Sequence, residues 1–127
     1  MPSGLLLCDD LLFASRITGE ARALGLTVKP ARSLEQLLDL AGQDSPSCVL
    51  IDLAFPGLVL PDLFRRLAEA CNSSPRVVAY GSHVDTESLR SARSAGCDPV
   101  LPRSKFVEEL PRALPQWFAG APRPENA

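Results

Sequence analysis

The sequence is poor in the side chains that most often build metal and disulfide sites. It contains a single histidine, His83, and four cysteines, none of which belongs to a C-x-x-C pair. Because structural zinc sites use closely spaced pairs of such ligands, this spacing argues against a zinc centre. Cys8 and Cys48 lie inside apolar runs, where a free cysteine packs like a small hydrophobic residue. We therefore expect free thiols in a reducing, cytoplasmic environment, and His83 in a surface loop.

Strong charge and long apolar segments are also missing. The net charge is −2, so no general electrostatic attraction to nucleic acid or to an anionic membrane is expected. No apolar run approaches the roughly 20 residues that span a bilayer. No Lys or Arg precedes the first leucine run, so we expect no signal peptide. A hydrophobic content of 46% in 127 residues is typical of one soluble globular domain.

What the sequence does contain is a regular alternation of apolar, strand-like runs with helix-like segments. The expected strands are residues 4–8, 26–29, 47–53, 76–80 and 99–101. The expected helices are residues 10–24, 33–42, 61–71 and 86–96, with a last one inside 104–118. Strict alternation with short connections favours a parallel sheet covered by helices on both faces. The predicted fold is α/β, a five-stranded doubly wound sheet in the order 2-1-3-4-5.

Several of these helices begin with recognisable signals. Ser33 and Gln36 match a capping box, in which each side chain satisfies a backbone donor at the helix start. Asp85 can cap the fourth helix in a similar way. Pro61 suits the first turn of the third helix, where its missing N–H is not needed.

The C-terminal part of the chain is less regular. Pro111 fits the last helix only if that helix begins near residue 106 or 107, which would keep the proline close to the helix start. Trp117 and Phe118 are expected to pack this helix onto the body, or to contact a partner if they are exposed. The final segment, GAPRPENA, is typical of a tail or linker. We expect one domain over residues 1–119 and a flexible tail or linker start at 120–127.

Acidic residues follow two of the predicted strands directly. Asp9 and Asp10 come after the first strand, and Asp52 ends the third. In the predicted strand order these strands are neighbours at the topological switch point, so the three carboxylates would share one cleft. Such a group is unfavourable without a cation, and Mg²⁺ is a hard ion that prefers oxygen ligands. Alternatively, the acids are solvated loop residues, and Asp9 or Asp10 caps the first helix.

Three segments, LLLCDD, VLIDLAFPG and GCDPVLPRS, resemble the signature regions of response-regulator receiver domains, over residues 4–118. This resemblance implies that Asp52 is the phosphoacceptor aspartate. It also implies that Asp10 and Asp52 bind Mg²⁺ directly, that Asp9 holds metal-bound water, and that Ala54 offers a backbone carbonyl.

The sequence departs from the receiver pattern at three positions. Gly81 stands where receivers have a Thr or Ser hydroxyl, and Ser82 could replace it only if the loop rearranged. Val100 stands where many receivers have a switching Tyr or Phe. Arg103 stands where receivers have Lys, and its planar guanidinium has a different geometry. Either Arg103 reaches a phosphoryl oxygen, or it forms a standing bidentate pair with Asp52 that competes with Mg²⁺.

These replacements resemble atypical or pseudo-receiver domains, which signal by protein–protein contact without ordinary phosphorylation. A conventional Mg²⁺-dependent receiver phosphorylated on Asp52 is the alternative. A flavodoxin-like nucleotide-binding enzyme is a third reading, but two carboxylates stand where its phosphate loop would be. The resemblance implies a protein partner (a histidine kinase, a phosphotransfer protein or an output protein), and a homodimer through the fourth and fifth helices. No enzymatic activity is expected beyond self-phosphorylation and its reversal.

Overall fold

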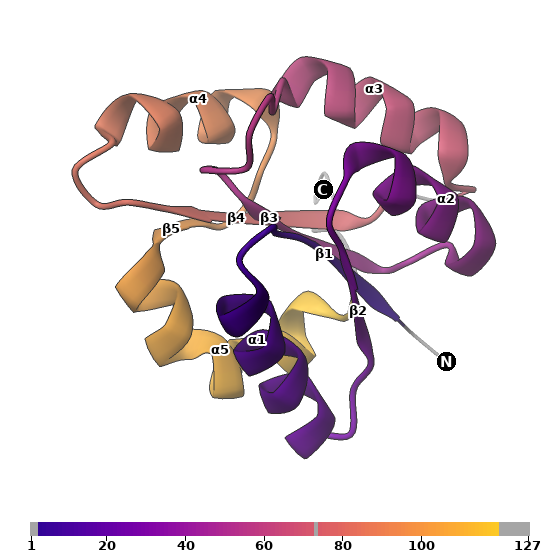
Figure 1. The fold of residues 1–127 in the computed structure, drawn as a ribbon, viewed down its shortest axis with the longest axis horizontal. Helices are drawn as coiled ribbons and strands as arrows, with labels where there is room; N and C mark the ends of the chain where they lie inside the picture. Colours follow the sequence, from indigo (N-terminus) through magenta and orange to yellow (C-terminus); the bar gives the residue numbers. More distant parts are fainter. Residues whose placement is uncertain (1–2, 73, 120–127) are drawn as a thin grey trace.

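Five strands and five helices alternate in this computed structural model, which describes residues 3–72 and 74–119 (Figure 1). The strands are β1 (Gly4–Leu7), β2 (Val28–Ala31), β3 (Cys48–Asp52), β4 (Arg76–Gly81) and β5 (Val100–Pro102). The helices are α1 (Leu11–Ala23), α2 (Leu34–Asp44), α3 (Leu60–Ala70), α4 (Thr86–Ala95) and α5 (Arg103–Trp117). Neighbouring strands are parallel, in the order β2-β1-β3-β4-β5, which confirms the predicted fold.

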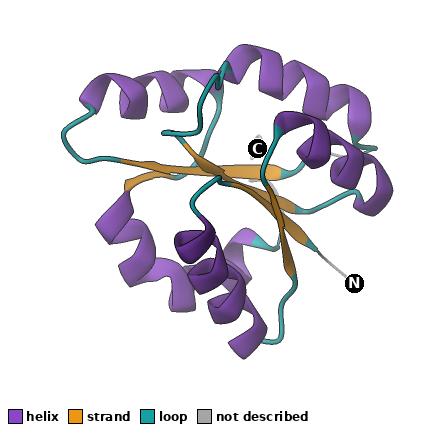
Figure 2. Cartoon of the chain, in the orientation of Figure 1, coloured by secondary structure: helices purple, strands orange, loops and turns teal. Residues whose placement is uncertain are grey.

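Helices cover both faces of this sheet. Figure 2 shows α2, α3 and α4 on one face, called here the α2–α4 face, and α1 and α5 on the other, the α1/α5 face. Because successive side chains of a strand point to opposite faces, β1 sends Leu5 and Leu7 into one core and Leu6 into the other. Both β1 and β3 are buried along their whole length, as central parallel strands are. No helix among the described residues is long and apolar enough to cross a membrane.

The predicted capping residues do cap their helices. Ser33 Oγ accepts a hydrogen bond from the Gln36 amide at 3.1 Å, and Gln36 Oε1 accepts one from the Arg32 amide at 2.9 Å. Asp85 Oδ1 accepts a hydrogen bond from the Ser88 amide at 3.2 Å. These contacts satisfy donors that a helix start leaves without partners inside the helix. They explain why α2 and α4 begin where the sequence predicts.

The second strand lies two residues later than predicted. It covers Val28–Ala31 instead of 26–29 and contains Pro30. Strand β2 is at the edge of the sheet and pairs with β1. An edge strand can accept a proline because one side of its backbone needs no donor for the sheet.

The last helix corrects the prediction about Pro111. Helix α5 begins at Arg103, so Pro111 and Pro115 both lie well inside it. Both prolines are on the exposed side of the helix, where water can solvate the carbonyls that lose their partners. On the opposite side, Trp117 and its neighbour Phe118 are buried, which confirms that they pack this helix onto the body.

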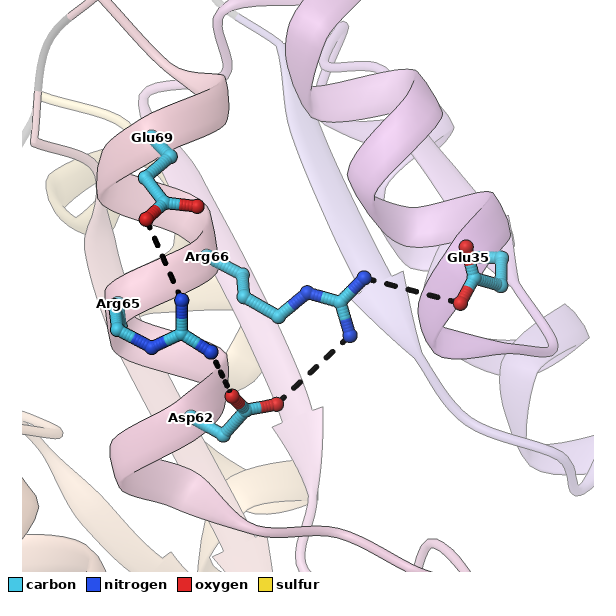
Figure 3. Close-up of polar contacts among 5 residues, drawn as sticks. All are labelled: Glu35, Asp62, Arg65, Arg66 and Glu69. Atoms are coloured by element: carbon cyan, nitrogen blue, oxygen red, sulfur yellow. Dashed lines mark hydrogen bonds and ion pairs between the residues drawn. The ribbon is translucent and has the colours of Figure 1, made fainter.

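Ion pairs connect α2 and α3 on the surface (Figure 3). Arg66 on α3 lies 3.8 Å from Glu35 on α2 and 3.8 Å from Asp62 on its own helix. Arg65 pairs with Asp62 and, at 3.4 Å, with Glu69. Such solvent-exposed pairs contribute little to stability. This side of α3 is therefore a solvated helix face.

Candidate functional site

Asp52, the last residue of β3, is the one buried charged residue among those described, with 3% of its surface exposed. Its Oδ1 accepts a hydrogen bond from the Ala54 amide at 2.9 Å. Its Oδ2 lies 3.6 Å from the Cys8 thiol sulfur and 3.6 Å from Nη2 of Arg103. A buried carboxylate is costly unless it is hydrogen-bonded and paired with a positive charge. Both requirements are met here by residues of the chain itself.

Arg103 follows β5 directly and begins α5. Its ion pair with Asp52 is a single contact, so the two-pronged geometry that we hypothesised is not formed. The guanidinium lies over the Phe13 ring, 4.5 Å from the ring centroid, and 5.9 Å from that of Tyr80. A planar cation can stack on an aromatic ring while one edge faces a carboxylate. Arg103 is therefore shared between Asp52 and an aromatic wall.

The acids after β1 are arranged differently from Asp52. Asp9 and Asp10 are both exposed, and Asp10 Oδ1 caps α1 by accepting a hydrogen bond from the Phe13 amide at 3.1 Å. Within residues 3–72 and 74–119, no group of three or more His, Cys, Asp or Glu side chains is placed to hold a metal ion. Carboxylates are suitable donors for Mg²⁺, but Asp9 and Asp10 are not gathered with Asp52 into a preformed ligand group. The proposed ligands Asp9, Asp10, Asp52 and Ala54 remain a prediction.

A pocket of about 400 Å³ opens at this edge of the sheet. It is lined by Asp52, Ala54, Gly81, Ser82, His83, Arg103 and Ser104. His83 is exposed in the loop after β4, as expected. The pocket brings together the residues predicted from β3, β4 and β5, whereas Asp9 and Asp10 do not line it.

Gly81, the last residue of β4, faces a leucine that the sequence analysis missed. A Cβ atom built on Gly81 would lie 3.2 Å from Cδ1 and 3.3 Å from Cβ of Leu53. The Leu53 amide is fixed by a 2.9 Å hydrogen bond to the Tyr80 carbonyl. A Thr or Ser side chain at position 81 would therefore begin in tight contact with Leu53, which would have to shift by a few tenths of an ångström. Ser82 does not replace it, since its Oγ accepts a hydrogen bond from the Val84 amide at 3.4 Å.

Comparison with solved structures gives consistent matches over nearly the whole chain. The receiver domain of the Francisella response regulator 1452 superposes with a TM-score of 0.76 at 21% identity, covering 94% of this chain and 98% of that one. The chain has the fold of a response-regulator receiver domain. No protein-family model and no curated protein matches the sequence.

Two further matching structures contain a bound partner protein or a phosphorylated aspartate. The receiver domain of Saccharomyces cerevisiae Ssk1, solved in complex with the phosphotransfer protein Ypd1, has a TM-score of 0.76 at 14% identity, with 93% and 89% coverage. A Burkholderia pseudomallei response regulator with a phosphorylated aspartate, calcium and citrate has a TM-score of 0.70 at 18% identity, with 94% and 72% coverage. At these identities the likeness establishes the receiver fold.

Four aromatic side chains form a row on the α1/α5 face, called here the aromatic row: Phe13, Tyr80, Phe106 and Trp117. The sequence analysis did not predict this row. The ring centroids of Phe13 and Tyr80 are 5.2 Å apart, those of Tyr80 and Phe106 4.5 Å, and those of Phe106 and Trp117 5.8 Å. Aromatic pairs at these separations attract each other beyond their burial. Val100 lies on the opposite, α2–α4 face, so the row does not use the position of the receiver aromatic switch.

Two ionisable groups next to Asp52 stay neutral near pH 7. Burial raises the pKa of Tyr80, and the neighbouring Cys8 thiol and Asp52 carboxylate raise it further. Burial also raises the pKa of Cys8; Tyr80 and the Asp10 carbonyl oppose this rise, and the Asp52 carboxylate adds to it. The Tyr80 hydroxyl is buried and has no hydrogen-bond partner of standard geometry among the described residues. Neither group is therefore an ionised nucleophile, and both support the Asp52 carboxylate as neutral neighbours.

The domain boundary at 119 remains a prediction, because residues 120–127 lie outside the described part of the chain.

Proposed function

We propose that this chain is a receiver-like signalling domain that acts by protein–protein contact, with weak or no phosphorylation of Asp52. The observation that carries this proposal is the packing of Leu53 against Gly81. In receivers the residue at the Gly81 position supplies a hydroxyl that bonds the phosphoryl group. Here that hydroxyl is missing, and a side chain added at this position would begin in tight contact with Leu53.

The state of Asp52 supports the same conclusion. Its Oδ1 is held by the Ala54 amide, and its Oδ2 faces Arg103. Phosphoryl transfer to Asp52 would have to disturb this pairing, and the product would lack the hydroxyl contact at Gly81. A weakened acceptor is expected from both effects.

A conventional phosphoacceptor receiver is the second candidate, and one observation favours it. The pocket of about 400 Å³ leaves room beside Asp52, and Ser82, His83 and Ser104 line it with polar groups. Arg103 has 44% of its side chain exposed, so it has space to move toward an incoming phosphoryl group.

Acetyl phosphate with Mg²⁺, followed by intact-mass measurement, separates these candidates. We expect little or no gain of a phosphoryl group over the time in which a conventional receiver is fully modified. The matched control is Asp52→Ala, which removes the acceptor. Rapid gain of one phosphoryl group that disappears in Asp52→Ala would overturn our proposal and establish the conventional receiver.

The partner is proposed to be a protein: a histidine kinase, a phosphotransfer protein or an output protein. A homodimer through α4 and α5 is part of the proposal. Sedimentation analysis of the wild type and of Arg90→Glu on the exposed side of α4 tests the dimer. A dimer that Arg90→Glu leaves intact would place the contact elsewhere.

A further inference from the structure

The buried carboxylate of Asp52 has a counter-ion within the chain. Its other contacts, the Ala54 amide and the Cys8 thiol, are neutral donors. Arg103 brings a full positive charge to 3.6 Å from Oδ2. A nearby cation offsets the cost of burying a negative charge. Arg103 therefore does for Asp52 what a bound metal ion would do electrostatically.

Asp52 alone does not explain why a long, half-exposed arginine stays in this place. A contact at 3.6 Å is too long for a hydrogen bond and so does not by itself fix the direction of the side chain. The closer support is Phe13, whose ring lies 4.5 Å from the guanidinium carbon. Phe13 is itself held edge-on against Tyr80, which is fully buried.

Asp10, the second acid after β1, acts on the same arrangement. Asp10 Oδ1 accepts a hydrogen bond from the Phe13 amide and so fixes the first turn of α1. This cap fixes the backbone from which the Phe13 ring extends. The receiver resemblance assigns Asp10 to metal binding. In this chain Asp10 supports Phe13, on whose ring Arg103 stacks.

We propose that Phe13 is a positioning residue that holds the Arg103 guanidinium beside Asp52, so that the chain supplies an internal cation where the fold family implies a metal ion. The inference concerns the unmodified protein and holds whether or not Asp52 accepts a phosphoryl group. It follows that external Mg²⁺ competes with Arg103, and that removing the support of Phe13 makes this competition easier for the metal.

Titration with Mg²⁺, followed by the amide NMR signals of Asp52 and Ala54, tests this inference. Arg103→Gln should bind Mg²⁺ more tightly than the wild type, because the internal cation is gone. Phe13→Leu should bind it about two- to fivefold more tightly, the size expected from a partly exposed cation–π contact. Phe13→Tyr keeps an aromatic face and should restore the wild-type affinity. Leu12→Ala, at an adjacent and highly exposed position, is the matched control and should change nothing.

The double variant Phe13→Leu/Arg103→Gln separates positioning from a general structural effect. If Phe13 acts through Arg103, adding Phe13→Leu to Arg103→Gln leaves the Mg²⁺ affinity unchanged. Arg103→Lys keeps the charge but loses the planar stacking, so it should behave like Phe13→Leu. Because position 103 is partly exposed, this variant does not require the core around Phe13 to repack. Equal effects of Phe13→Leu in both backgrounds would overturn the inference. So would an Arg103→Gln variant that binds Mg²⁺ no better than the wild type.

Discussion

The two faces of the sheet surround the end of β3 with different chemistry. On the α1/α5 face, Asp52 meets a thiol, a guanidinium and the first rings of the aromatic row. On the α2–α4 face, the next residue, Leu53, packs against Gly81 and the aliphatic core. The first face holds a charge in place, whereas the second meets the end of β3 with apolar packing. In this fold, stabilising the buried carboxylate and responding to a change at that carboxylate are therefore separate properties.

The largest expected effect distinguishes the cores of the two faces. Phe106→Ala should reduce the free energy of unfolding by about 3–5 kcal/mol, because it opens a cavity in the middle of the aromatic row. Val100→Ala on the other face removes fewer buried carbons and should cost about 2 kcal/mol. Urea unfolding of both variants measures the difference. An equal loss would mean that the protein refills the Phe106 site or that Phe106 is packed less tightly than its burial indicates.

Alkaline unfolding compares the buried thiols of the two faces. Burial raises the pKa of Cys48, on the α1/α5 face, from 9.0 to about 12, and that of Cys97, on the α2–α4 face, from 9.0 to about 11. Because the unfolded thiol ionises at lower pH than the folded one, this stability is complete below pH 9 and is lost as the pH rises toward the folded value. By pH 12 the loss should be on the order of a few kcal/mol.

Cys48→Ala and Cys97→Ala should each flatten the dependence of unfolding free energy on pH above 9, beyond any constant offset from the lost packing. The flattening should extend further for Cys48→Ala. Urea unfolding at several pH values between 8 and 12 checks this, and identical pH profiles for wild type and both variants would contradict it.

A smaller effect is expected where Leu53 meets Gly81. Gly81→Thr should lower the free energy of unfolding by about 1–3 kcal/mol, because the new side chain overpacks against Leu53. Adding Leu53→Ala should recover part of this loss, and the double variant is the one in which acetyl phosphate labelling of Asp52 should improve. Gly19→Thr, at a position with nothing within 4 Å of an added Cβ, is the control for the substitution itself. Full tolerance of Gly81→Thr alone would show that Leu53 yields freely.

The smallest effect is predicted for the Tyr80 hydroxyl. Tyr80→Phe removes a buried polar group that has no hydrogen-bond partner of standard geometry, so stability should change by less than about 1 kcal/mol, or rise. Thermal and urea unfolding give the sign. A loss of 2 kcal/mol or more would indicate that this hydroxyl is bonded to the Cys8 thiol and supports Asp52.

The sequence predicted the fold and part of the site, for reasons visible in particular residues. Continuous apolar runs are enough to identify buried parallel strands, and the strand order then places Asp52 and Arg103 at one edge. Phe13 and Leu53 were missed because their importance depends on which ring or backbone they meet in space, and no local pattern records that. The predicted start of α5 was wrong because the prediction treated Pro111 as incompatible with a helix interior. In the structure Pro111 lies inside α5 on its exposed side.

The aromatic row has a practical consequence. The chain contains one tyrosine and one tryptophan, and both belong to this row, at Tyr80 and Trp117. All of the protein's tryptophan emission, and all energy transferred to it from tyrosine, therefore comes from one line of rings that ends beside Arg103. The intrinsic fluorescence of the unlabelled protein therefore depends on the surroundings of the candidate site, near Tyr80, and on those of the end of α5, at Trp117.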